Sequence, residues 1–163
     1  MNLSMIEIQI SQNQRDRAQI LFDFGILNNS IREGDGKMTG ALGEIVVFDY
    51  YSSKGRKVVH AQDFNFDLLI EGFKVEVKTL ARNGIPKLEN NCHLSNHNAK
   101  QRCDYFIFVD VLNDYSRAWI KGVISRQRFD EIKVFKKKGE FDGPFFQFKS
   151  DTWIITNKDL LTI

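Results

Sequence analysis

The sequence contains little proline and little cysteine, and both scarcities narrow the class of protein. Two prolines and 14 phenylalanines among 163 residues are typical of a compact globular chain and exclude a proline-rich disordered one. The two cysteines, Cys92 and Cys103, are too few for a disulfide framework at this size, so we expect a reducing compartment. The length suits one domain, which we place over residues 1–163.

Long apolar runs and a strong charge excess are also missing. No stretch approaches the roughly 18 apolar residues of a membrane helix, and the N-terminal residues lack the pattern of a signal peptide. We therefore expect a cytoplasmic protein with no membrane partner, and we expect no small-molecule cofactor. The formal net charge of +2 permits a nucleic-acid partner without indicating one.

Hydrophobic periodicity predicts an alternation of strands and helices. Residues 3–10 alternate like a half-buried strand, and Ser11 can cap a helix that ends near Phe24. A helix over residues 38–55 follows, ended by Gly55. The remaining predictions are strands at 57–62, 66–70, 73–79, 105–111, 117–125 and 152–156, a short helix over 95–101 capped by Ser95, and a helix over 126–135. This order predicts an α/β (α+β) fold with a mixed central sheet flanked by helices.

The stretch FDLLIEGFKVEVKT, residues 66–79, predicts a β-hairpin. We place a two-residue turn at Glu71–Gly72, which fixes the register of the two strands and makes one face apolar. On the other face, this register sets Asp67 directly opposite Glu76, with Lys78 two residues further along and pointing the same way.

Two facing carboxylates repel each other unless a cation or a proton lies between them. Mg²⁺ or Mn²⁺ would compensate Asp67 and Glu76, because hard divalent ions take carboxylate, water and phosphate oxygens as ligands. Lys78 could then hold a phosphate or orient a water for attack on phosphorus. The alternative is a solvated strand face on which Lys78 simply pairs with Glu76.

Glu44 offers a third carboxylate. It falls on the buried stripe of the predicted helix over 38–55, and Gly40 and Gly43 would let that helix approach the sheet closely. Aimed at the hairpin, Glu44 would complete a metal site. The alternative is a surface glutamate that extends from the edge of the stripe into solvent.

These residues resemble the PD-(D/E)XK nuclease superfamily. GALGE contains Glu44, NFDLL contains Asp67, and EVK contains Glu76 and Lys78, at the spacing of the central signature of that family. The proline of the family name is absent, because Phe66 precedes Asp67. The resemblance implies a restriction-endonuclease-like core of order αβββαβ and a divalent-metal-dependent DNA endonuclease.

The resemblance covers residues 29–111 and assigns roles to individual residues. We expect the catalytic core at 38–112, an N-terminal extension at 1–37, and further strands and a helix at 113–163. The implied metal ligands are Asp67, Glu76 and the backbone carbonyl of Val77, with Glu44 acting through the metal or its water, Lys78 positioning the nucleophile, and Gln101 as a supporting polar residue.

One small domain has little surface for reading a long sequence, so we expect cutting that is selective for structure, such as branched or damaged DNA. Cleavage of both strands would suit a homodimer. The alternative function is a non-catalytic nucleic-acid-binding or assembly domain that retains the fold.

Basic residues elsewhere are candidate phosphate contacts. They are Lys54, Arg56 and Lys57 after the Glu44 helix, and Arg82, Asn83 and Lys87 in a predicted loop over 80–94. A second basic run, 136–138, is interpreted as a solvated face. The phenylalanines lie in apolar runs and are interpreted as core.

A zinc site is a weaker alternative. Cys92, His93, His97 and Cys103 are all possible zinc ligands, but their spacing fits no common finger, and the adjacent Cys92 and His93 point apart in an extended chain. A loop with incidental cysteine and histidine is the favoured interpretation.

Overall fold

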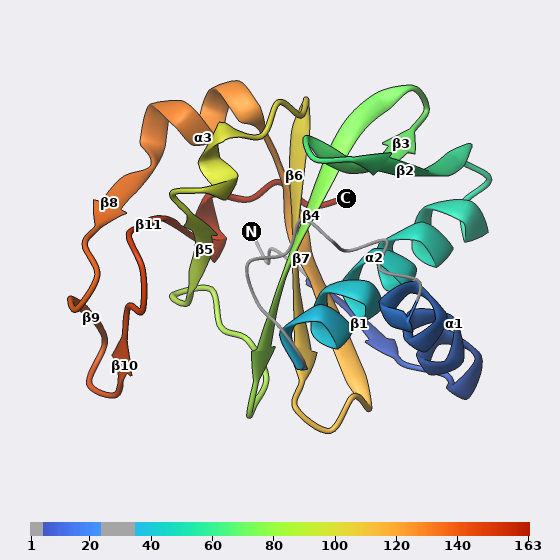
Figure 1. The fold of residues 1–163 in the computed structure, drawn as a ribbon, viewed down its shortest axis with the longest axis horizontal. Coiled ribbons are helices and arrows are strands. Elements are labelled where there is room, and N and C mark those ends of the chain that lie inside the picture. The colour runs from blue at the N-terminus through green and yellow to red at the C-terminus, as the bar shows by residue number, and fades with distance from the viewer. Residues whose placement is uncertain (1–4, 24–34) are drawn as a thin grey trace.

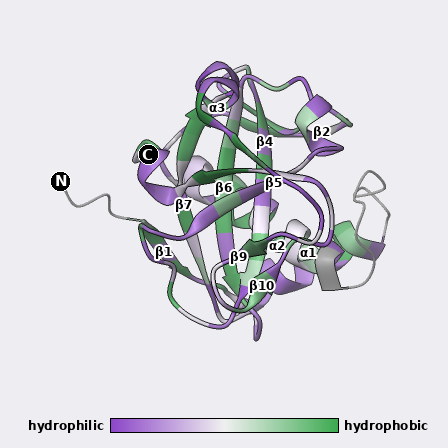
Figure 2. Ribbon diagram, turned by 90° about the vertical axis from the view of Figure 1, so that its left-hand side faces the viewer, coloured by the Kyte–Doolittle hydropathy of each residue, from purple (hydrophilic) through white to green (hydrophobic). Residues whose placement is uncertain are grey.

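A six-stranded sheet runs through the centre of the molecule (Figure 1), in the strand order β1-β7-β6-β4-β3-β2. The computed structural model describes residues 5–23 and 35–163. Helices α1 and α2 cover one side of the sheet, and α3 with a three-stranded sheet of order β5-β11-β8 covers the other. Figure 2 shows hydrophobic residues concentrated in β6 and β7, between these layers. The predicted mixed α/β class is confirmed.

The N-terminal elements are β1 (Ile6–Gln9) and α1 (Gln12–Asp23). Ser11 caps α1 as predicted: its Oγ accepts from the Gln14 N–H at 3.1 Å, and Gln14 Oε1 accepts from the Ser11 N–H at 3.0 Å. Two exposed backbone donors are thus satisfied by one pair of side chains. Residues 3 and 4 of the predicted strand and Phe24 at the predicted helix end lie outside the described residues.

Helix α2 (Asp35–Ser53) lies against β4 and contributes to a core shared with β3, β4, β6 and β7. Gly55, with φ of +76°, follows its end as predicted. A Cβ atom on Gly43 would lie 1.8 Å from Thr79 Oγ1, so only glycine permits this approach of helix to strand. A Cβ atom on Gly40 would meet no atom within 4 Å, so the predicted packing role of Gly40 is wrong.

Strands β2 (Val58–Asp63), β3 (Phe66–Ile70) and β4 (Phe73–Arg82) form an antiparallel meander. The predicted two-residue turn is correct: Glu71 and Gly72 have φ of +50° and +83°, as the tight turn requires. Lys57 secures the unusual glutamate, because its N–H donates to Glu71 Oε1 at 2.8 Å.

Strand β6 (Tyr105–Leu112) lies parallel to β4 and antiparallel to β7 (Arg117–Ser125). Seven of its eight residues, from Phe106 onward, are buried. The prediction of a central strand covered on both faces is confirmed.

The structure differs from the sequence analysis between β4 and β6. The predicted helix over 95–101 is instead the end of strand β5 (Asn91–Ser95) followed by one 3-10 turn, η1 (Asn98–Lys100). Strand β5 forms because Cys92 and Leu94 point into a second core and its backbone pairs with β11 (Thr152–Thr156). The predicted loop over 80–94 is shortened at both ends by β4 and β5.

The C-terminal part also departs from prediction at one helix. Helix α3 (Arg126–Ile132) is capped by Ser125 and ends early, because the following residues form β8 (Val134–Lys136) on the edge of β11. The remaining elements are β9 (Phe141–Asp142), β10 (Phe146–Gln147) and the 3-10 turn η2 (Asn157–Asp159). In the ranges that the structure covers, no helix is both long and apolar enough to cross a membrane.

Candidate active site

The site begins where β3 and β4 separate. Their ladder ends at the pair Leu68–Val75, after which β4 continues along β6. The predicted direct pairing of Asp67 with Glu76 is therefore absent from the ladder. Instead, Asp67 Oδ2 accepts from the Val77 N–H at 2.8 Å, so a carboxylate takes the place of a strand carbonyl.

Glu44 reaches the fork between β3 and β4 from α2, where it is only 5% exposed. Its pKa lies well above the ordinary value, because burial disfavours the charged form and the charges of Asp67 and Glu76 repel it. Burial also raises the pKa of Asp67, whereas the charge of Lys78 lowers it. Hydrogen bonding between the two carboxyl groups raises the pKa of Glu44 and lowers that of Asp67.

Glu76 and Lys78 lie on β4 and form an ion pair, Lys78 Nζ donating to Glu76 Oε1. Glu76 is only 3% exposed, and burial, followed by the charge of Asp67, raises its pKa to about 8. The second oxygen, Oε2, is buried and has no hydrogen-bond partner. A buried acceptor without a hydrogen bond destabilises the folded protein, so its presence requires an explanation.

Gln101 lies beside Glu76, and its polar side chain lowers the pKa of Glu76. It follows η1, is only 4% exposed, and donates from Nε2 to the carbonyl of Phe64 at 2.6 Å. Its own Oε1 is buried without a partner. The glutamine therefore ties the β2–β3 connection to the site and presents an unused oxygen there. The simple alternative of an exposed helix glutamine is wrong.

The structure thus brings together Glu44, Asp67, Glu76, Lys78 and Gln101 from four separate segments. With every acid ionised, the three carboxylates and one ammonium would carry a net charge of −2. Within residues 5–23 and 35–163, no group of three or more His, Cys, Asp or Glu side chains is arranged to hold a metal ion. No such grouping of the described residues therefore supports the predicted ligand set that combines Glu44 with Asp67 and Glu76.

The predicted phosphate contacts lie apart from the site. Lys54, Arg56 and Lys57 are exposed beyond the end of α2, and Lys54 lies about 15 Å along the helix direction from Glu44. Arg82 is engaged within the protein: Nη1 donates to Asp110 Oδ2 at 2.6 Å, and Nη2 donates to Asn90 Oδ1 at 2.9 Å.

The other two loop candidates are exposed. The Asn83 side chain accepts a hydrogen bond from Asn113, whereas Lys87 interacts through its backbone, with its N–H donating to Asn90 Oδ1 at 2.7 Å. Both side chains extend from the connection between β4 and β5. Asn83 and Lys87 therefore stay predictions.

The zinc candidates are dispersed. Cys92 is fully buried and donates to Asn157 Oδ1 at 3.1 Å, whereas Cys103 belongs to the apolar cluster around β6. His93 Nε2 lies 2.9 Å from Asp142 Oδ2, and His97 packs edge-on against the Phe64 ring at 5.5 Å. The four side chains thus lie in separate environments, and Cys92 and His93 lie on strand β5 instead of in the predicted loop.

Sequence reasoning missed a buried ionic cluster around Asp110. Lys121 Nζ lies 3.0 Å from Asp110 Oδ1, and Arg82 approaches the other oxygen, so one carboxylate links β4, β6 and β7. Both Asp110 and Lys121 are almost fully buried. The sequence does contain a signal for this cluster. Asp110 and Lys121 each interrupt an apolar run, and opposite charges in neighbouring buried strands indicate an ion pair.

No protein-family model and no curated protein matches this sequence. Interpretation of the site rests on its own residues and their geometry. The constellation of acids, lysine and glutamine, with its raised pKa values, is the feature that a functional proposal has to explain.

Proposed function

We propose that the protein is a divalent-metal-dependent nuclease that hydrolyses phosphodiester bonds, with a restriction-endonuclease-like core. The observation that carries the proposal is the convergence of Glu44, Asp67, Glu76 and Lys78 at the fork between β3 and β4. The order of α2, β2, β3, β4 and β6 is compatible with that core except for its second helix, in whose place the chain has β5 and η1. A purely structural cluster gains nothing from two buried acids, Glu44 and Glu76, that repel each other and the half-buried Asp67.

The donor set suits Mg²⁺ or Mn²⁺. Asp67 and Glu76 supply hard carboxylate oxygens, of which Glu76 Oε2 is buried and unpartnered. These two side chains, with the backbone carbonyl of Val77, would hold the ion, since Mg²⁺ commonly takes one or two carboxylates and keeps several waters. Glu44 would then act on a water rather than as a required ligand.

Each side chain has a role in hydrolysis. A divalent cation, when bound, would neutralise charge on the phosphate and make an adjacent water more acidic. Lys78, held by Glu76 Oε1, can donate from Nζ to a phosphate oxygen as negative charge develops there. Glu44, once ionised, can accept the proton of the attacking water. Water adds to phosphorus, one backbone P–O bond breaks, and the leaving oxygen takes up a proton from solvent, so that a phosphate end and a hydroxyl end result.

Cleavage of DNA by isosteric variants tests this proposal. The wild-type protein and Asp67→Asn are incubated with supercoiled plasmid and branched duplexes in Mg²⁺ or Mn²⁺. Asparagine can still accept from the Val77 N–H, so the fork is retained while the charge is lost. We expect cleavage to fall at least 100-fold in Asp67→Asn and in Lys78→Ala, as for loss of transition-state stabilisation of about 3 kcal/mol.

Matched surface changes are the controls. Glu131→Gln and Lys158→Ala alter an exposed acid and an exposed lysine and should cleave like wild type. DNA binding without cleavage in either metal would favour the alternative, a non-catalytic nucleic-acid-binding domain. Cleavage that survives in Asp67→Asn would contradict the assignment of the site.

A further inference from the structure

The hairpin of β9 and β10 exposes aromatic side chains that belong to no core. Phe145 is 95% exposed and Phe141 is 60% exposed, which corrects the interpretation of the phenylalanines as core. The hairpin turns at Gly143, with φ of +73°. Such exposure of a large apolar ring is unfavourable in water, so it marks a surface that acquires a partner.

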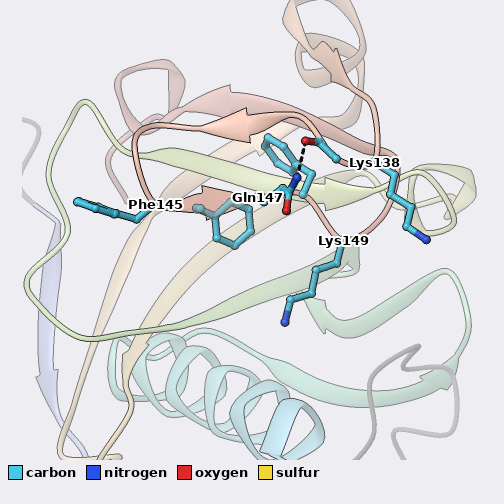
Figure 3. Close-up of a pocket in the computed structure, with 7 residues that line it drawn as sticks. Lys138, Phe145, Gln147 and Lys149 are labelled. Carbon is cyan, nitrogen blue, oxygen red and sulfur yellow. Dashed lines mark hydrogen bonds between the residues drawn. The ribbon is translucent and has the colours of Figure 1, made fainter.

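A cavity of about 650 Å³ adjoins this hairpin (Figure 3). Its lining includes Phe145, Phe146 and Phe148 together with Gln147, Lys138 and Lys149. Figure 3 shows Lys138 and Lys149 directed away from the hairpin strands, and both residues are exposed, while Phe145 projects from the turn end of the hairpin. Aromatic rings and ammonium groups therefore share one surface.

The hairpin is fixed to the body of the protein through Asp142. Asn91 Nδ2 donates to Asp142 Oδ1 at 2.7 Å, and His93 Nε2 lies 2.9 Å from Oδ2. The His93 ring packs against Phe146 and Phe148, with centroids 5.2 and 5.1 Å apart. Strand β5, which carries Asn91 and His93, thus holds the hairpin in place, and Phe145 is presented from an anchored element.

The charges beside the rings are available to a ligand. In the part of the chain that the structure describes, no carboxylate lies within 4.0 Å of the ammonium nitrogen of Lys138 or Lys149. The nearby Asp151 accepts from the backbone N–H of Lys138 at 2.9 Å and leaves the side chain free. A ligand that suits this surface has a flat π face and negative charge.

We propose that this surface, which we call the hairpin platform (Lys138, Phe145, Phe146 and Lys149), binds unpaired nucleotides of a nucleic-acid strand. Bases stack on the phenylalanine rings, and the lysines contact the phosphates. Paired duplex hides its base faces, so the platform selects a single-stranded segment. An apolar protein partner would gain nothing from two lysines without acidic partners.

The platform connects to the candidate active site through β5. One end of this strand holds the hairpin, and Ser95 at the other end accepts from the Asn98 N–H of η1, which leads to Gln101 beside Glu76. This inference rests on the proposed function and extends it. It names DNA with an unpaired segment as the substrate class of the nuclease. The binding step itself is independent of catalysis.

Binding of a fluorescein-labelled oligothymidylate of about ten nucleotides tests the platform. Fluorescence anisotropy is measured in EDTA, so that cleavage plays no part. We expect Phe145→Ala to raise Kd about tenfold and Phe145→Tyr to remain within about twofold of wild type, because stacking needs only the ring. Lys149→Ala should raise Kd and reduce the salt slope by about 0.7. A blunt duplex of equal length should respond less than twofold to Phe145→Ala.

Two matched controls lie on the same segment. Phe141→Ala removes an exposed ring that does not line the cavity, and Lys137→Ala removes an exposed lysine outside it; both should bind like wild type. The proposal is wrong if wild type does not bind the oligonucleotide, if Phe145→Ala binds as wild type does, or if Phe141→Ala loses equally much. A Phe145→Ala change that abolishes only self-association in sedimentation would assign the surface to a second copy instead.

The plasmid assay keeps the two proposals distinct. Normal plasmid cleavage with failed oligonucleotide binding would overturn the platform alone. Oligonucleotide binding that depends on Phe145, without cleavage of any DNA, would support the platform and count against the nuclease.

Discussion

Replacing Glu76 by glutamine is expected to make the metal-free protein more stable at alkaline pH. The pKa of Glu76 in the folded protein is about 8, against an ordinary value of 4.5. Between these pH values the folded protein binds more protons than the unfolded chain, so its free energy of unfolding falls as pH rises. One pKa unit corresponds to about 1.36 kcal/mol, so the residue lowers stability by roughly 3–4 kcal/mol between pH 5 and pH 8.

Glutamine cannot ionise, so the variant lacks this decline. The attraction of Lys78 already contributes to the pKa of about 8, so its loss offsets nothing further. Urea unfolding in EDTA at pH 5, 6, 7 and 8 should therefore show Glu76→Gln about 3–4 kcal/mol more stable than wild type at pH 8, with the advantage gone at pH 5. For Glu131→Gln, at an exposed position on α3, the free energy of unfolding should change with pH as it does in wild type. Parallel curves for Glu76→Gln would refute the reasoning about burial and repulsion.

Three further expectations follow from the same contacts. Saturating Mg²⁺ should stabilise wild type at pH 8 by about 1–3 kcal/mol in urea unfolding and leave Asp67→Asn unchanged, because only the folded site binds the ion. Gly43→Ala should cost about 2–3 kcal/mol, since its Cβ would meet Thr79 Oγ1, and Thr79→Ala should recover part of that loss; additive losses would contradict the contact. Asp110→Ala should cost about 3–5 kcal/mol, because Lys121 is left buried without its counter-charge, and a loss below 1 kcal/mol would show that the pair is dispensable.

The elements that the sequence predicted correctly are those whose signal is local. Alternation of polar and apolar residues, with turn-forming residues at the ends, predicts each of these elements within a few residues. They are the turn at Glu71–Gly72 and the strands 66–70, 117–125 and 152–156. Strand β5 could not be found in this way, because its partner β11 lies about sixty residues further along the chain. Non-local pairing overrides the weak local preference of a polar segment for a helical turn.

The candidate site shows the same division between local pattern and tertiary arrangement. Spacing alone placed Asp67, Glu76 and Lys78 near one another, because a hairpin fixes its own register. It could not show that β4 leaves β3 at Val75, or that Asp67 would then accept from the Val77 N–H. The fork depends on β4 pairing with β6, which is a property of the whole sheet.

The raised pKa values and the unpartnered oxygen of Glu76 have one cause, which is an excess of negative charge at the site. One lysine cannot compensate the three carboxylates of the site, so the pKa values of Glu44 and Glu76 are raised and these acids hold their protons to higher pH. A divalent cation would supply the missing positive charge and displace those protons, because both compete for the same oxygens. Affinity for Mg²⁺ should therefore rise with pH up to about 8, the pKa of Glu76, and level off above it. An arrangement that weakens the resting protein in this pH range is better explained by selection for ion binding than by selection for stability.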